Sequence, residues 1–142
     1  SNFTTAQITT LAQFSSVPIV STQPELSPLR IDTIENGELD QAIAMDLAVL
    51  AWSPLGGGRI GDPGNTREQN VAAALSSVAA AHGVSRTAAA YSWIMAHPAR
   101  PIPIVGSQNP ARIIEAADAF KIKWTRADWY SVLVAARGVP LP

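Results

Sequence analysis

Hydrophobic and polar positions along the chain follow two different spacings. Short apolar runs that end at Pro, Gly or polar residues are typical of buried strands, whereas apolar residues three and four positions apart mark one face of a helix. The runs predict strands at 17–23, 47–52 and 102–106. The helical spacing predicts helices at about 5–13, 39–47, 68–82, 86–95, 110–116 and 125–136. Strands that alternate with helices predict an α/β fold with a parallel sheet and helices outside it.

Residues at the ends of these segments support the assignment. Thr4 and Gln7 have the spacing of a capping box, and Ser85 suits the N-cap of the fourth predicted helix. Pro103 lies inside the third apolar run, which favours an edge strand or the first turn of a strand. The polar segment 59–66 joins a strand to a helix, and we expect it to be mobile.

The second apolar run leads directly into a run of glycines. Residues 47–52 are predicted to form a strand that is buried on both faces, followed by Ser53-Pro54, Leu55 and three glycines, Gly56 to Gly58. Glycines without side chains allow a ligand such as a phosphate to lie against backbone N–H groups. Taken by itself, the same pattern also fits a flexible loop after a strand.

Polar and aromatic residues recur where the predicted strands end. Gln23 ends the first strand, Trp52 and Ser53 end the second, and Gly106 to Asn109 follow the third. Ligands of parallel α/β folds bind at the carboxyl ends of the strands. A dinucleotide needs a flat ring for stacking, amides for its carboxamide and N–H groups for its pyrophosphate, so these residues predict a dinucleotide site.

Composition and charge exclude several other classes of protein. The chain has 142 residues, 47% of them hydrophobic and 15% charged, which suits one globular domain. The net charge of -1 gives no reason to expect nucleic acid or an anionic membrane as a partner. There is no cysteine, and two histidines are too few for a histidine-rich metal site. The start lacks the pattern of a signal peptide and no apolar run is long enough for a membrane span, so we expect a cytoplasmic protein.

The motifs together resemble a known family. These motifs are Ser1-Asn2-Phe3 and the stretches 23–28, 51–56 and 103–113. In their order and spacing, the chain resembles the C-terminal half of an aldo-keto reductase of the bacterial oxidoreductase branch. The resemblance implies the C-terminal half of a (β/α)₈ TIM barrel, with residues 1–142 forming a single unit of about four βα units whose first strand is missing.

The resemblance also implies a cofactor site. The residues that match the family's cofactor contacts are Ser1, Asn2 and Gln23 for the nicotinamide carboxamide, Trp52 for stacking on the nicotinamide, Ser53, Leu55 and Gly57 for the pyrophosphate, and Ser107 and Arg112 for the adenosine 2′-phosphate. Many members have Lys where this chain has Gly106. Ser107 and Arg112 lead us to expect NADPH as the cofactor; because Gly106 supplies no cation, the preference rests on Arg112 and NADH is the alternative. From the residues alone, Trp52 also fits a core aromatic and Arg112 a solvated helix arginine.

The family's catalytic Asp, Tyr, Lys and His come from the first half of the barrel, and none of those motifs occurs here. Tyr91 and Tyr130 fall in predicted helices, and Lys121 and Lys123 lie between late helices. We expect this chain to be a piece of an enzyme that reduces small aldehydes or ketones, inactive by itself and without catalytic residues of its own. The alternative is a non-catalytic nucleotide-binding half-barrel or assembly module. A half-barrel has open sheet edges, so we also expect self-association or pairing with a missing N-terminal half.

Overall fold

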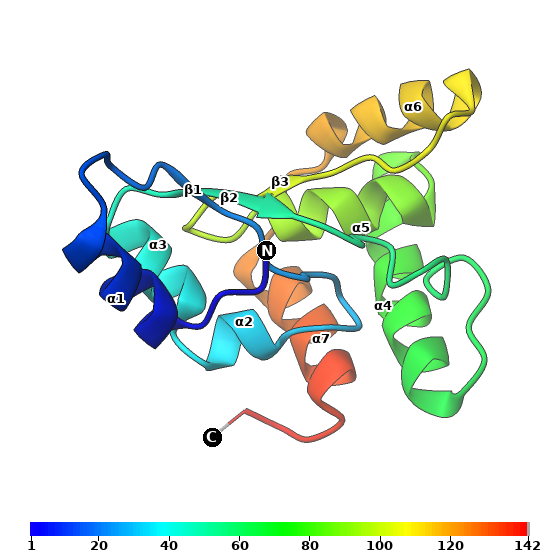
Figure 1. Cartoon of the computed structure of the whole chain (residues 1–142). Helices are drawn as coiled ribbons and strands as arrows, with labels where there is room; N and C mark the ends of the chain where they lie inside the picture. Colours follow the sequence, from blue (N-terminus) through cyan, green and yellow to red (C-terminus); the bar gives the residue numbers. More distant parts are fainter. Residues whose placement is uncertain (142) are drawn as a thin grey trace.

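The computed structural model describes residues 1–141 and contains a parallel sheet of three strands in the order β1-β2-β3 (Figure 1). The strands are β1 (Ser21–Thr22), β2 (Ala48–Ala51) and β3 (Ile102–Pro103). Ser21 pairs with Ala48, and Leu50 pairs with Ile102, both in parallel register. The predicted parallel α/β fold is confirmed, and Pro103 lies in an outer strand of this sheet.

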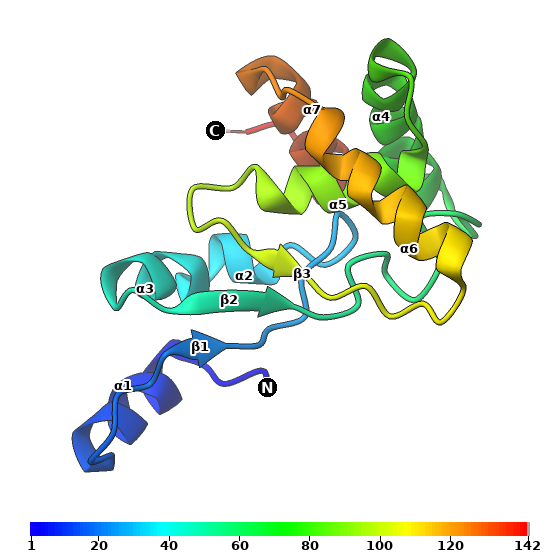
Figure 2. The same ribbon diagram turned by 90° about the horizontal axis from the view of Figure 1, so that it is seen from above.

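Helices connect the strands and pack mainly on one side of the sheet. They are α1 (Thr5–Phe14), α2 (Asp32–Glu35), α3 (Glu38–Ala44), α4 (Thr66–His82), α5 (Arg86–Met95), α6 (Pro110–Ala116), the 3₁₀ helix η1 (Ala117–Lys121) and α7 (Arg126–Arg137). Figure 1 shows α2, α3 and α7 together beneath the sheet, and Figure 2 shows α6 beyond the end of β3. None of the helices within residues 1–141 has the length and apolar character needed to cross a bilayer.

Polar side chains fix where the helices begin, as the sequence predicts. The Thr4 side chain accepts from the Gln7 N–H and the Gln7 side chain accepts from the Thr4 N–H, which completes the capping box. The Ser85 side chain accepts from the Ala88 N–H at the start of α5, and the Asn109 side chain accepts from the Ala111 N–H at the start of α6. Each cap satisfies an N–H group that the first turn of a helix leaves without a partner, so these helix starts are locally encoded.

The prediction that residues 47–52 are buried on both faces is wrong. Val49 and Ala51 are buried against the helices, whereas Ala48 is exposed and Leu50 is half-buried. The opposite face of the sheet stays open, and its apolar residues Ile102 and Ile104 are exposed. Alternating side chains of a strand point to opposite faces, so a sheet covered on one side buries only every second residue.

The strands are shorter than predicted, and two short helices were not foreseen. Pairing of β1 stops at Thr22 and resumes as a single bridge between Glu25 and Trp52. α2 lies within a segment predicted to be irregular, and η1 continues α6 as a 3₁₀ turn. Elements of four or five residues are too short to give a clear hydrophobic period.

The core lies between the sheet and the helices and supports the strand ends. Its largest fully buried side chains include Leu26, Val49, Ile60, Leu75 and Trp93. Ile60 belongs to the loop after β2, and Leu55 of the same loop packs against the core, so this loop is anchored at both points. The carboxyl ends of β2 and β3 therefore project from a fixed base.

Candidate functional site

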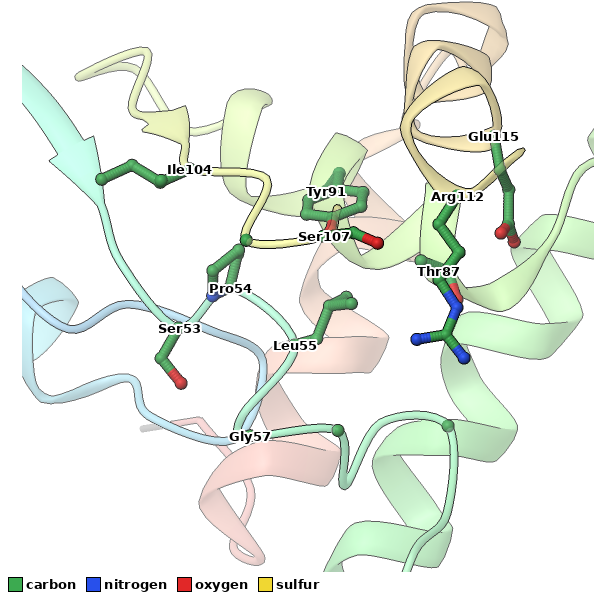
Figure 3. Close-up of a pocket in the computed structure, with 13 residues that line it drawn as sticks. Ser53, Pro54, Leu55, Gly57, Thr87, Tyr91, Ile104, Ser107, Arg112 and Glu115 are labelled. Carbon is green, nitrogen blue, oxygen red and sulfur yellow. The ribbon is translucent and has the colours of Figure 1, made fainter. Parts of the chain in front are cut away.

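A cavity of about 540 Å³ lies beyond the carboxyl ends of β2 and β3 (Figure 3). Its walls are the glycine loop (residues 53–64), one face of α5, the segment after β3 and α6. Five residues that the sequence predicts for cofactor binding line it: Ser53, Leu55, Gly57, Ser107 and Arg112. The structure therefore brings together residues from two loops that are some fifty positions apart in sequence.

The glycine loop offers unpaired backbone donors to this cavity. Gly56 N–H donates to the Ser53 carbonyl at 2.8 Å, and Gly58 N–H donates to the Leu55 carbonyl at 3.2 Å. Within residues 1–141, no acceptor is bonded to the N–H groups of Leu55 or Gly57. Gly57 has φ of +68°, a conformation that an L side chain adopts at a cost. Free N–H groups of this kind bind anions.

A buried carboxylate holds the far part of the glycine loop. Glu68, in the first turn of α4, accepts from the Gly64 N–H at 2.7 Å and pairs with the Arg59 guanidinium at 3.1 Å. The Gly64 hydrogen bond, helped by the positive charge of Arg59, holds the pKa of Glu68 below its ordinary value, although burial acts in the opposite direction. The segment predicted to be mobile is thus tied to α4 by its own side chains.

A second group of predicted residues meets next to the cavity. Asn2 N–H donates to the Gln23 carbonyl at 3.0 Å, and the side-chain oxygen of Asn2 accepts from the Trp52 indole at 2.9 Å. The same oxygen accepts from the Glu25 N–H at 3.0 Å. Trp52 is half-buried and lies outside the core, while Ser1 is exposed beside Asn2. Within the described chain, the side-chain NH₂ groups of Asn2 and Gln23 have no bonded partner.

The far end of the cavity carries charged groups from α6. The side chains of Arg112 and Glu115, three positions apart, both extend from α6 toward the cavity (Figure 3). Arg112 is exposed to solvent, and no carboxylate of the described residues lies within ion-pair distance of it. Ser107 Oγ accepts from the Asn109 N–H at 3.1 Å, which leaves its hydroxyl hydrogen available.

Three lining residues with polar side chains were missed by sequence reasoning: Thr87, Tyr91 and Glu115. Thr87 and Tyr91 are four positions apart on α5 and so share a helix face, which is the signal that could have found them. Burial, together with the negative charge of Glu115, raises the pKa of Tyr91 above its ordinary value. Tyr91 therefore stays protonated at neutral pH and can serve as a hydrogen-bond donor to a ligand.

Known proteins match both the sequence and the fold. The sequence model of the aldo/keto reductase family matches residues 1–133. A 6-dehydroglucose reductase of Novosphingobium aromaticivorans is 61% identical over 142 residues, which is 100% of this chain and 47% of that protein. A 6-dehydroglucose reductase of Agrobacterium fabrum is 36% identical over 97% of this chain and 46% of its own length. The chain spans about half the length of these curated relatives.

Solved structures support the same assignment. An aldo/keto reductase from Brucella melitensis is 30% identical with a TM-score of 0.72, and the match covers 94% of this chain and 45% of that chain. A thermostable aldo-keto reductase solved with the inhibitor epalrestat has the same fold, with a TM-score of 0.82 at 19% identity over 94% of this chain and 46% of that chain. A parallel sheet with outer helices that matches less than half of such barrels is a half-barrel. The chain belongs to the aldo/keto reductase family.

Proposed function

We propose that this chain binds a nicotinamide dinucleotide for a reductase that converts aldehydes or ketones to alcohols. The observation that carries the proposal is the cavity beyond β2 and β3, with the free N–H groups of Leu55 and Gly57 and the cation of Arg112 on its walls. NADPH is the proposed cofactor and NADH the alternative. The cytoplasm remains the proposed location.

The residues fit the parts of a dinucleotide in order along the site. The unpaired NH₂ groups of Asn2 and Gln23 suit the carbonyl oxygen of a carboxamide, and the half-buried ring of Trp52 offers a face for stacking. The N–H groups of Leu55 and Gly57 suit a pyrophosphate. When bound, the cofactor supplies the hydride, and the role of this chain is to hold and orient it.

Arg112 and Glu115 have opposite effects on the choice between cofactors. The guanidinium of Arg112 attracts a 2′-phosphate, whereas the carboxylate of Glu115 on the same wall repels a phosphate and accepts from a free hydroxyl. Gly106 adds no second cation. We therefore propose a preference for NADPH that depends on Arg112 and is modest in size.

A sugar aldehyde is the proposed substrate. The basis is the relative that is 61% identical over this whole chain and is named 6-dehydroglucose reductase. Reduction of its carbonyl needs an acid that protonates the forming alkoxide. Tyr91, on α5, lines the cavity with the residues assigned to the phosphates, whereas Asn2, Gln23 and Trp52 do not line it; Tyr130 lies on α7 outside the cavity. We propose that the acid comes from a partner half of the barrel, so that the chain alone binds the cofactor without reducing the substrate.

The open face of the sheet favours an assembly role beside the binding role. Ile102 is 54% exposed and Ile104 is 37% exposed on the face opposite the helices. An apolar face of this kind favours association with another protein surface. We propose that this face pairs with a second half-barrel, either another copy or the missing N-terminal half. Sedimentation equilibrium that finds only monomer at all concentrations would contradict pairing with another copy.

Calorimetric titration tests the binding proposal directly. We expect the wild-type chain to bind NADPH and NADH, and Arg112→Ala to weaken NADPH binding about tenfold with little effect on NADH. Arg126→Ala is the matched control, because Arg126 lies over the Tyr130 ring on α7, away from this cavity. Failure of the wild-type chain to bind either dinucleotide would overturn the proposal. Consumption of NADPH with 6-dehydroglucose by the chain alone would overturn the proposed need for a partner half.

A further inference from the structure

The glycine loop is held by a chain of polar contacts that the proposed function does not use. Glu68 is the centre of these contacts, and its side chain is only 5% exposed. One carboxylate oxygen pairs with Arg59 at 3.1 Å, and the other accepts from the Gly64 N–H at 2.7 Å. Arg59 Nε then donates to the Gly56 carbonyl at 2.8 Å. The contacts therefore connect α4 to the glycine that precedes Gly57.

The last of these contacts decides the orientation of one peptide group. The Gly56 carbonyl and the Gly57 N–H belong to the same planar peptide unit, and the chain described here has no cis peptide bond. In a trans unit the C=O and N–H bonds point in opposite directions. Because Arg59 holds the carbonyl on its own side and does not line the cavity, the Gly57 N–H is directed away from Arg59.

The Gly56 carbonyl also accepts from the Arg59 backbone N–H at 3.4 Å, so without the shorter side-chain bond the peptide group would be held less firmly. Gly56, Gly57 and Gly58 follow one another; a Cβ atom added at Gly57 or Gly58 would meet no atom within 4 Å, whereas one added at Gly56 would lie 3.0 Å from Leu29. Glycines place few steric limits on rotation of the peptide planes between them. Orientation of the Gly57 N–H therefore depends on hydrogen bonds, and the Arg59 guanidinium provides the side-chain bond to this unit.

We propose that Glu68 is a positioning residue for the dinucleotide: it holds Arg59, and Arg59 fixes the Gly56–Gly57 peptide so that the Gly57 N–H can donate to the pyrophosphate. This inference rests on the proposed function, since it assumes that a dinucleotide occupies the cavity. Glu68 itself does not line the cavity and acts only through Arg59 and Gly64.

The rest of the glycine loop is anchored independently, which makes the proposal testable. Arg86 donates to the Ile60 carbonyl at 3.0 Å and to Ser76 Oγ at 2.8 Å, and the Ile60 side chain is 1% exposed. Loss of the Glu68 charge should therefore release the Gly56–Gly57 peptide while Ile60 stays in the core.

The experiment compares Glu68→Gln with wild type by calorimetry, using NADPH and adenosine 2′-monophosphate as ligands. We expect roughly tenfold weaker NADPH binding in the variant and unchanged binding of the monophosphate, which has no pyrophosphate. Amide exchange of Gly58 and Gly64 should become faster in the unliganded variant. Arg59→Met should have the same effect on NADPH, and the double variant should be no weaker than either single one. The Arg59 side chain is half-exposed, so its replacement should remove little core packing.

Glu35→Gln is the matched control, because it removes one carboxylate from an ion pair with Arg137 that is remote from the loop. The inference would be overturned if Glu68→Gln left NADPH affinity unchanged, or lowered the affinity for both ligands equally. It would also be overturned if NADPH affinity fell without faster amide exchange, or if the two substitutions had additive effects on affinity in the double variant. Failure of wild type to bind NADPH would instead remove the proposed function and the inference with it. The two failures are thus distinguished by the wild-type titration.

Discussion

The indole N–H of Trp52 donates to the side-chain oxygen of Asn2 at 2.9 Å, across 50 positions of sequence. The same oxygen also accepts from the Glu25 N–H, so Asn2 holds the end of β2 and the segment after β1 together. The bond fixes the orientation of the Trp52 ring. It also fixes the Asn2 amide, whose NH₂ group is left as the free donor. One hydrogen bond thus sets both the ring that we propose for stacking and the donor that we propose for the carboxamide.

Trp52→Phe should keep an aromatic face but remove this bond. We expect the affinity for NADPH to fall about fivefold, because the ring and the Asn2 amide both lose a fixed orientation. Calorimetric titration measures the change. Trp124→Phe is the control, since the Trp124 indole bonds to Ser92 in the helix layer and does not line the cavity. An unchanged affinity in Trp52→Phe would show that the bond has no part in cofactor binding.

The sequence foretold much of this site because its signals are local. The Thr4 cap, the glycines after Trp52 and the Asn109 cap of α6 depend on neighbours within a few residues. The Asn2–Trp52 bond joins positions 50 apart, and their approach depends on the whole fold. The Glu68–Gly64 bond spans four positions and the Arg59–Glu68 pair nine, but the path of the loop that brings Arg59 to Glu68 is not set by a local signal.

The prediction that residues 47–52 are buried on both faces was wrong for a different reason. An apolar run such as 47–52 indicates that a strand is covered, but it does not say by which part of the protein. In this chain the helices cover Val49 and Ala51, and no element within residues 1–141 buries Ile102. The hydrophobic pattern is that of a whole barrel, whereas the described residues form half of one.

Gly106→Lys should increase the preference for NADPH over NADH. A Cβ atom added at Gly106 meets no atom within 4 Å, and Gly106 lines the same cavity as Arg112. A second cation near a 2′-phosphate should raise the ratio of the two affinities about tenfold. Calorimetric titrations with both dinucleotides measure this ratio. Ala111→Lys, which adds the same charge at an exposed position outside the cavity wall, should leave the ratio unchanged.

Acid pH should remove the contribution of Glu68 to the glycine loop. Its pKa is lowered in the folded chain from 4.5, chiefly by the Gly64 hydrogen bond. A carboxyl whose pKa is lowered by folding stabilises above its unfolded pKa, and this effect is lost as the pH falls through the folded pKa. Binding of NADP⁺ should therefore favour wild type over Glu68→Gln at pH 7, and the two affinities should converge as the pH falls below the lowered pKa of Glu68. If wild type still bound NADP⁺ more tightly than Glu68→Gln at acid pH, the Glu68 charge would not be the group that holds the loop.

Trp93 and Trp129 join α5 to α7 by stacked rings and two reciprocal hydrogen bonds. Their rings stack at 5.0 Å with an angle of 11°, and each indole N–H donates to the backbone carbonyl of the other residue at 3.0 Å. Either Trp→Phe change removes one of these bonds and should lower the free energy of unfolding by about 1–3 kcal/mol. The double variant should lose about 1 kcal/mol less than the sum, since the stacking is shared by both residues. Urea unfolding measures the free energy of unfolding of the two single variants and the double variant. Phe120→Leu is the control, because Phe120 is 79% exposed. Strictly additive losses would mean that the two indoles stabilise the helix pair independently.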